Sequence, residues 1–123
     1  MHQVKSAKTS DRFAAFVQDQ LSDLDDLVMK RMFGGTGLYL DGVFFGIIYG
    51  DHLYFRVSEE TIAEYKKRKM KPFSPFKKRG TEHGYYEVPL EILESPDDLV
   101  KWAHAAQKTP PLTSRKRAAR RAR

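Results

Sequence analysis

The spacing of apolar residues divides the chain into helical and extended segments. Between residues 11 and 24, apolar side chains recur at helical spacing, and Ser10 precedes them as a candidate N-cap. Alternation replaces that spacing from residue 27, which predicts a meander of antiparallel strands over residues 27–57. Asp41-Gly42 predicts a two-residue hairpin turn inside the meander, because both central residues of a type I′ turn need a positive φ. Gly50-Asp51 predicts a second tight turn.

The second half of the chain combines helix and strand signals. Ser58 and the two glutamates after it predict the start of a helix, which ends in a run of basic residues before Pro72. A loop is expected over 71–84 and a short strand over 85–88. Ser95-Pro96-Asp97-Asp98 is typical of a helix start and predicts a final amphipathic helix.

These elements predict an α+β fold with the order α-β-β-β-α-β-α. Strands joined by short turns make the sheet mainly antiparallel, with helices packed on one face. The length of 123 residues favours one domain. We expect that domain to span residues 10–107, between a disordered N-terminus (1–9) and a basic disordered tail (108–123).

The strand aromatics divide between the two faces of the expected sheet. Alternation favours the core for Phe45 and Phe55. Tyr39, Tyr54 and Tyr86 are expected on the outer face or in a dimer contact, where aromatic residues are enriched.

Signals of catalysis and of cofactors are weak. The chain has no cysteine, and its four histidines never pair at the i, i+4 spacing of a helical metal site. Gly34-Gly35-Thr36-Gly37 lacks the Lys-Ser/Thr ending of a phosphate loop, so a bulge or sharp bend is the better interpretation. We therefore expect a non-enzymatic protein without a metal or cofactor. No apolar segment is long enough to cross a membrane, and we expect a cytoplasmic protein.

Positive charge is concentrated in two clusters. The net charge is +6, but residues outside 107–123 carry 15 basic and 16 acidic side chains. The first cluster extends from Lys66 to Arg79. We expect it to be a phosphate-contacting patch with Phe73 and Phe76 interleaved, or else a solvated helix end and a polar loop with Phe73 in the core. The tail cluster suits non-specific binding to nucleic acid, or else serves only solubility. The candidate nucleic-acid or partner-binding residues are Lys66, Lys67, Arg68, Lys69, Lys71, Lys77, Lys78, Arg79, Arg115, Lys116, Arg117, Arg120, Arg121 and Arg123.

Several short strings follow one another in a specific order along the chain. One carries the motif residues Arg31, Met32, Phe33, Gly34, Gly35, Gly37, Tyr39, Asp41 and Gly42. The others are Leu53-Tyr54-Phe55-Arg56-Val57, Met70-Lys71-Pro72-Phe73, Tyr85-Tyr86-Glu87-Val88-Pro89 and Trp102-Ala103. Taken in order, these strings resemble the TfoX/Sxy N-terminal domain family over roughly residues 10–107.

The resemblance implies a sandwich like that of type III secretion chaperones, often a homodimer. It also implies a competence or transcription co-regulator that binds a partner protein of the transcription machinery, DNA, or both. The alternative is a chaperone-like homodimeric interaction module without a nucleic-acid role. Full-length regulators of this kind carry a second, helical domain, where this chain has its basic tail.

Overall fold

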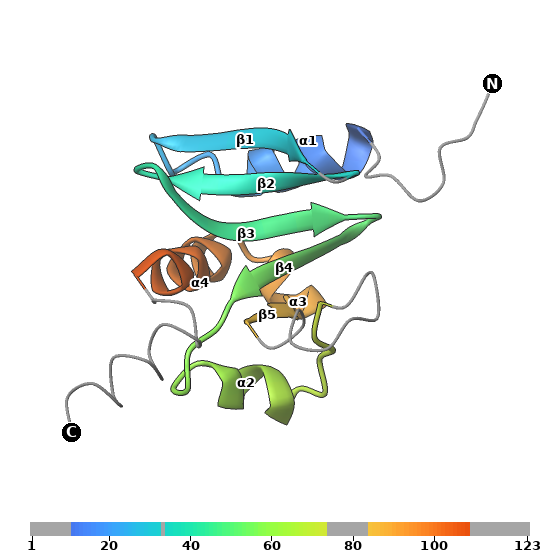
Figure 1. The fold of residues 1–123 in the computed structure, drawn as a ribbon, viewed down its shortest axis with the longest axis vertical. Helices are drawn as coiled ribbons and strands as arrows, with labels where there is room; N and C mark the ends of the chain where they lie inside the picture. The colour runs from blue at the N-terminus through green and yellow to red at the C-terminus, as the bar shows by residue number, and fades with distance from the viewer. Residues whose placement is uncertain (1–10, 33, 74–83, 109–123) are drawn as a thin grey trace.

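A five-stranded antiparallel sheet forms the centre of the protein (Figure 1). The computed structural model describes residues 11–32, 34–73 and 84–108. Each strand pairs with the next along the chain, in the order β1-β2-β3-β4-β5. The strands are β1 (Leu27–Met32), β2 (Gly35–Leu40), β3 (Val43–Tyr49), β4 (His52–Arg56) and β5 (Tyr85–Glu87).

Tight turns connect the first four strands. Asp41 (φ 53°) and Gly42 (φ 79°) both adopt positive φ, which confirms the predicted type I′ turn between β2 and β3. Gly34 (φ 83°) also has a positive φ, and Met32 pairs with Gly35 directly beyond it. Gly34 therefore lies in the turn between β1 and β2, and Gly35-Thr36-Gly37 belongs to β2. The meander thus has four strands where three were expected.

The helices are α1 (Asp11–Gln20), α2 (Ile62–Lys67), α3 (Leu90–Leu93) and α4 (Pro96–Lys108). The first helix ends earlier than the predicted residue 24, because the chain tightens into turns in which the Leu24 N–H bonds to the Leu21 carbonyl. The second helix begins at Ile62 and not at Ser58. The Ser58 hydroxyl instead accepts bonds from the N–H groups of Glu60 and Thr61, which orders the turn before the helix.

The other two helices lie after β5. The predicted start of α4 is confirmed: the Asp98 N–H donates to the Ser95 hydroxyl. The four-residue helix α3 was not expected, and it follows Pro89 directly, with the Leu93 N–H bonded to the Pro89 carbonyl. The α+β class is confirmed, with the order α-β-β-β-β-α-β-α-α.

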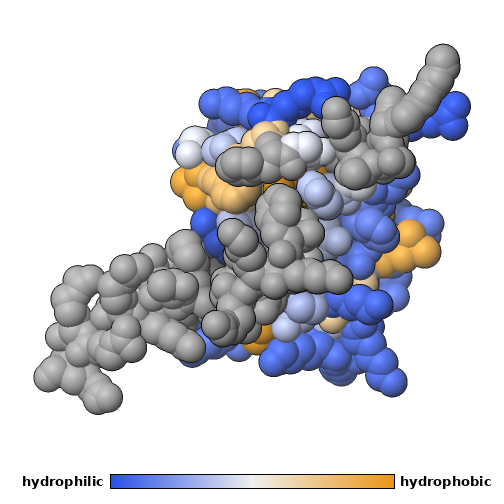
Figure 2. Space-filling view, turned by 45° about the vertical axis from the view of Figure 1, so that its right-hand side comes forward, coloured by the Kyte–Doolittle hydropathy of each residue, from blue (hydrophilic) through white to orange (hydrophobic). Residues whose placement is uncertain are grey.

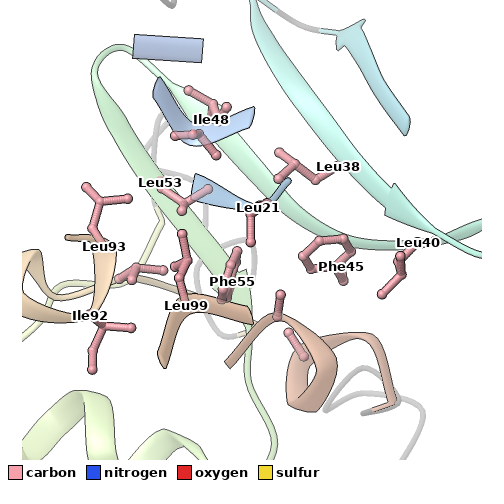
Figure 3. Packing of buried hydrophobic residues seen from close by; sticks show 14 of the residues in the cluster. Leu21, Leu38, Leu40, Phe45, Ile48, Leu53, Phe55, Ile92, Leu93 and Leu99 are labelled. Atoms are coloured by element: carbon pink, nitrogen blue, oxygen red, sulfur yellow. The ribbon is translucent and has the colours of Figure 1, made fainter. Parts of the chain in front are cut away.

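The core fills the space between one face of the sheet and the helices α1, α3 and α4 (Figure 3). Phe45 and Phe55 are fully buried there with ring centroids 5.4 Å apart, as predicted. The buried residues contributed by these helices are Val17, Ile92, Leu93, Leu99, Ala103 and Ala106, and Leu21 directly follows α1. Burial of this apolar surface is the main stabilising contribution to the fold.

Candidate functional site: a basic and aromatic groove

The face of the sheet opposite the helices carries a layer of aromatic side chains, which we call the outer face. Tyr54 lies on it, because Tyr54 alternates along β4 with the core residues Leu53 and Phe55. Tyr39 contacts Phe44 across the β2–β3 pair with ring centroids 5.2 Å apart. The predicted outer positions of Tyr39 and Tyr54 are therefore confirmed.

Tyr86 lies on the inner face, so its predicted outer position is wrong. It is the register partner of the core residue Phe55, and its ring lies 6.1 Å from that of Tyr65 on α2. The register between β4 and β5 decides the face, and a three-residue strand contains too little alternation to predict that register.

Two glycines of β2 make room for the outer aromatic layer. A side chain at Gly37 would overlap Met32 and press on the rings of Phe44 and Tyr39. A side chain at Gly35 would overlap the Ile48 carbonyl oxygen and touch the Tyr49 ring. Glycine at these positions allows the close approach of the Ile48 backbone to Gly35 and of the Met32 side chain to Gly37.

A groove of about 490 Å³ lies at the β5 end of the outer face. Three rings line it: Phe73 packs against Tyr54 at 4.7 Å and against Tyr49 at 5.7 Å between ring centroids. Residues 71–73 extend the sheet beyond β5, since the Phe73 N–H donates to the Tyr85 carbonyl at 2.9 Å and Pro72 pairs with Tyr86. This pairing places Phe73 on the outer face, and not in the core.

Two lysines, Lys69 and Lys71, bring positive charge to the groove. Lys69 has a positive φ of 62°, and it follows the C-cap Arg68 of α2. The Lys69 N–H bonds to the Lys66 carbonyl and the Met70 N–H to the Tyr65 carbonyl, a Schellman arrangement in which glycine usually occupies the left-handed position. A lysine therefore lines the groove at a position where its backbone conformation is unfavourable.

One acidic side chain, Glu87, lines the groove among the described residues. Its Oε2 lies 2.6 Å from Nδ1 of His52, so the carboxylate has a partner in the same wall. Burial, together with the charge of Glu87, raises the pKa of Tyr54 above its usual value.

The other residues of the first basic cluster fall into three groups. Lys66 and Lys67 are exposed on α2 and are not among the residues that line the groove, and Figure 2 shows hydrophilic surface at the lower end of the molecule. Arg68 forms ion pairs with Glu64 and Glu91 and lies over the Trp102 ring, so its charge is already engaged. Lys77, Lys78 and Arg79 lie outside the described residues, as do Phe76 and the tail residues Arg115, Lys116, Arg117, Arg120, Arg121 and Arg123.

A family model described as the TfoX N-terminal domain matches residues 19–109. The chain belongs to the TfoX N-terminal domain family. The match runs from the last two residues of α1 to the end of α4 and includes every strand of the sheet. None of the curated proteins compared with the chain matches it. Domains of the TfoX N-terminal family are regulatory and non-catalytic.

The motif residues of this TfoX N-terminal domain build its first two hairpins. Gly34 and the Asp41-Gly42 pair form the turns, and Gly35 and Gly37 admit the outer aromatic layer. Arg31 is exposed on β1, where its Nη2 lies 3.4 Å from an oxygen of Asp11. Phe33 lies outside the described residues. The motif thus describes how the TfoX sheet is built, and its residues do not converge on one chemical site.

The described part of this TfoX domain contains no group of three side chains able to hold a metal ion. In the same residues, no helix is long and apolar enough to span a membrane. Sequence reasoning found both lysines and Phe73 of the groove, but it missed Tyr49, His52 and Glu87. Those three come from strands that only the β3–β4–β5 register brings together.

Proposed function

We propose that this domain is a non-enzymatic regulatory module that attaches to nucleic acid through the groove formed by Tyr49, Tyr54, Lys69, Lys71 and Phe73. Its setting would be competence and transcription control in the cytoplasm, together with a protein of the transcription machinery. The observation that carries the proposal is the meeting of two lysines with three outer-face rings in one groove.

The chemistry of the groove suits a flexible single strand. Lysines attract phosphate through charge, and aromatic rings offer stacking surfaces to bases of any identity. Such contacts give weak binding that depends on salt, with a Kd on the order of 10⁻⁴–10⁻⁶ M at physiological salt. We therefore expect attachment without sequence preference, and specificity would come from the protein partner.

Fluorescence anisotropy of a labelled 12-nucleotide single strand, and of its duplex, tests the proposal at 50 and 200 mM salt. We expect the variant with Lys69→Gln and Lys71→Gln to bind the single strand about tenfold more weakly at low salt, with a salt slope reduced by about one to two. Phe73→Leu should weaken binding to the single strand more than binding to the duplex, because only unpaired bases can stack on the groove.

The matched control removes two charges elsewhere. Arg12→Gln with Lys108→Gln changes exposed residues of α1 and α4, on the helix-covered side of the sheet. Neutralising Arg115, Arg117, Arg120 and Arg121 measures the contribution of the tail. If the control weakens binding as much as the groove variant, or if the unmodified chain fails to bind at 50 mM salt, the groove proposal is wrong.

The second candidate function is a homodimeric interaction module without a nucleic-acid role. It is favoured by the outer face itself: among the described elements no helix covers it, and Val28 at the β1 edge is 45% exposed. Light scattering at ~100 μM decides this point, since a stable dimer persists at such a concentration. A monomer at that concentration would contradict this candidate.

A further inference from the structure

A second hollow lies on the helix side of the domain, between α2 and α4. It has a volume of about 290 Å³, and its lining residues come from the end of β4, from α2 and the turn before it, and from α4. Figure 1 shows the chain running from the end of β4 toward α2. Its surface is mostly apolar. Tyr65 and Trp102 meet edge to face in its wall at 4.9 Å between ring centroids, and Ala105 and Ala106 leave room above α4.

Arg56 supplies a buried positive charge to this pocket. The residue lines the pocket although it is only 8% exposed. Its Nη2 donates to the Gln107 carbonyl at 3.3 Å, and its guanidinium contacts the Tyr85 hydroxyl. Its Nε has no hydrogen-bond partner among the described residues, and no carboxylate in that part of the chain forms an ion pair with Arg56.

A buried guanidinium with an unused donor is the strongest sign of a ligand in the molecule. Buried polar groups in folded proteins are almost always paired, and buried charges almost always have a counter-charge. Nε itself is buried, so a ligand would reach Arg56 through the 8% of its surface that is exposed, since Arg56 lines the pocket. A guanidinium there favours a carboxylate as its partner.

We propose that the pocket between α2 and α4 binds a small organic monocarboxylate, with the carboxylate on Arg56 and an apolar, preferably aromatic, body against Trp102 and Tyr65. The volume allows about one ring and its carboxylate, which is near the lower limit of small-molecule pockets. For a ligand of that size we expect a Kd on the order of 0.1–1 mM.

The charges around the pocket favour a single negative charge. Lys101 at the edge adds attraction, but Glu60 also lines the pocket and would repel a dianion. Arg68 and Glu64 add little net charge, because Arg68 pairs with Glu64 and with Glu91. A carboxylate on an apolar body therefore suits the pocket better than a phosphate ester. None of its lining residues belongs to the outer-face groove, so this proposal does not depend on nucleic-acid binding.

The single tryptophan of the chain lies in the pocket wall, so its fluorescence reports on binding. The probes are phenylacetate, its neutral analogue phenylacetamide and the dianion phenyl phosphate, each titrated into the full chain at constant ionic strength. We expect a saturable change in Trp102 emission with phenylacetate. The amide and the phosphate should bind at least tenfold more weakly.

Two variants separate the pocket from general effects on folding. Ala105→Phe on the surface of α4 fills the pocket from the helix side and should abolish the response to phenylacetate. Arg56→Lys keeps the charge but removes the forked donors, and should weaken binding about tenfold. Lys108→Gln, on the same helix but outside the pocket, should leave binding unchanged. Circular dichroism checks that each variant is folded.

Three outcomes would overturn the proposal. They are equal binding of phenylacetate and phenylacetamide, full binding of phenylacetate by Ala105→Phe, and the absence of any saturable change in emission up to 20 mM phenylacetate.

Discussion

The two faces of the sheet are both rich in apolar residues, yet they are built differently. The inner face presents Leu38, Phe45, Ile48, Leu53 and Phe55 to three helices, and all five are nearly or fully buried. The outer face presents Tyr39, Phe44, Tyr49, Tyr54 and Tyr85, which pack sideways on one another and stay half-buried. The inner residues are aliphatic or phenylalanine, whereas most of the outer ones carry a hydroxyl.

This difference separates the residues that hold the fold from those available to a partner. A tyrosine hydroxyl can remain in water while its ring packs, so a tyrosine-rich face is compatible with both solvent and contact. Lys30 reaches over the Tyr39 ring at 5.2 Å, which adds a cation to the outer layer. The comparison predicts that substitutions on the inner face act mainly on stability, and those on the outer face mainly on binding.

The largest effect is expected from truncation of an inner aromatic residue. Phe45→Ala removes a fully buried ring and should lower the free energy of unfolding by about 3–5 kcal/mol, as measured by urea denaturation. Its neighbour in sequence, Phe44, points to the outer face, so Phe44→Ala should cost about 1–2 kcal/mol. Equal losses for the two variants would mean that the outer face is a second core.

The next effect distinguishes two glycines under the outer layer. Gly35→Ala should cost about 2–3 kcal/mol, because the new methyl group overlaps the Ile48 backbone, which pairing in the sheet holds in place. Gly37→Ala should cost nearer 1 kcal/mol, because it meets the flexible end of Met32. Combining each variant with Met32→Ala provides the control: the second change should relieve the cost at Gly37 and leave the cost at Gly35. Relief at both positions would contradict this account.

Sequence patterns predicted the inner face better than the outer one. The burial of Phe45 and Phe55, the Asp41-Gly42 turn and the start of α4 were predicted from local signals, and all three are confirmed. The groove depends on the register of β3, β4 and β5 and on the return of residues 71–73 to the sheet, which no local pattern contains. The pocket beside Arg56 was missed for the same reason, since β4, α2 and α4 meet only in the folded chain.

Alkaline pH should affect a tyrosine on the helix side more than one on the outer face. Tyr65 is 3% exposed, and burial raises its pKa above the usual value of about 10. Stability is therefore complete below pH 10 and falls as the pH rises further, because only the unfolded chain ionises Tyr65. Tyr65→Phe should recover about 1 kcal/mol of the stability lost at pH 11, measured by urea denaturation at pH 8 and pH 11. Tyr54→Phe, in the open groove, should recover less of this lost stability than Tyr65→Phe. A larger recovery for Tyr54→Phe would show that the groove excludes water better than the surroundings of Tyr65.

A smaller gain is expected from the strained lysine of the groove. Lys69→Gly relieves the positive φ of 62° and should raise the free energy of unfolding by about 0.5–1 kcal/mol. The same variant should weaken binding of a single-stranded oligonucleotide, because it removes a charge from the groove. Lys67→Gly, inside α2, is the control and should destabilise the protein by a similar amount. A variant at Lys69 that gains stability without any loss of binding would exclude this lysine from the groove's function.

The smallest effect on stability is expected at Asp26, which precedes the edge strand β1. A hydrogen bond to Asp41 raises the pKa of Asp26, and the negative charge of Asp41 acts in the same direction. A raised pKa means that protonation favours the folded state, so the contribution is present at acid pH and is lost as the pH rises through the pKa of Asp26 in the folded protein. Asp26→Asn should therefore raise the urea midpoint at pH 7 and flatten its dependence on pH toward the acid range. Asp25→Asn removes the same charge one position earlier, and it should change neither the urea midpoint at pH 7 nor its dependence on pH. Equal effects of the two variants would mean that only the net charge of the protein matters.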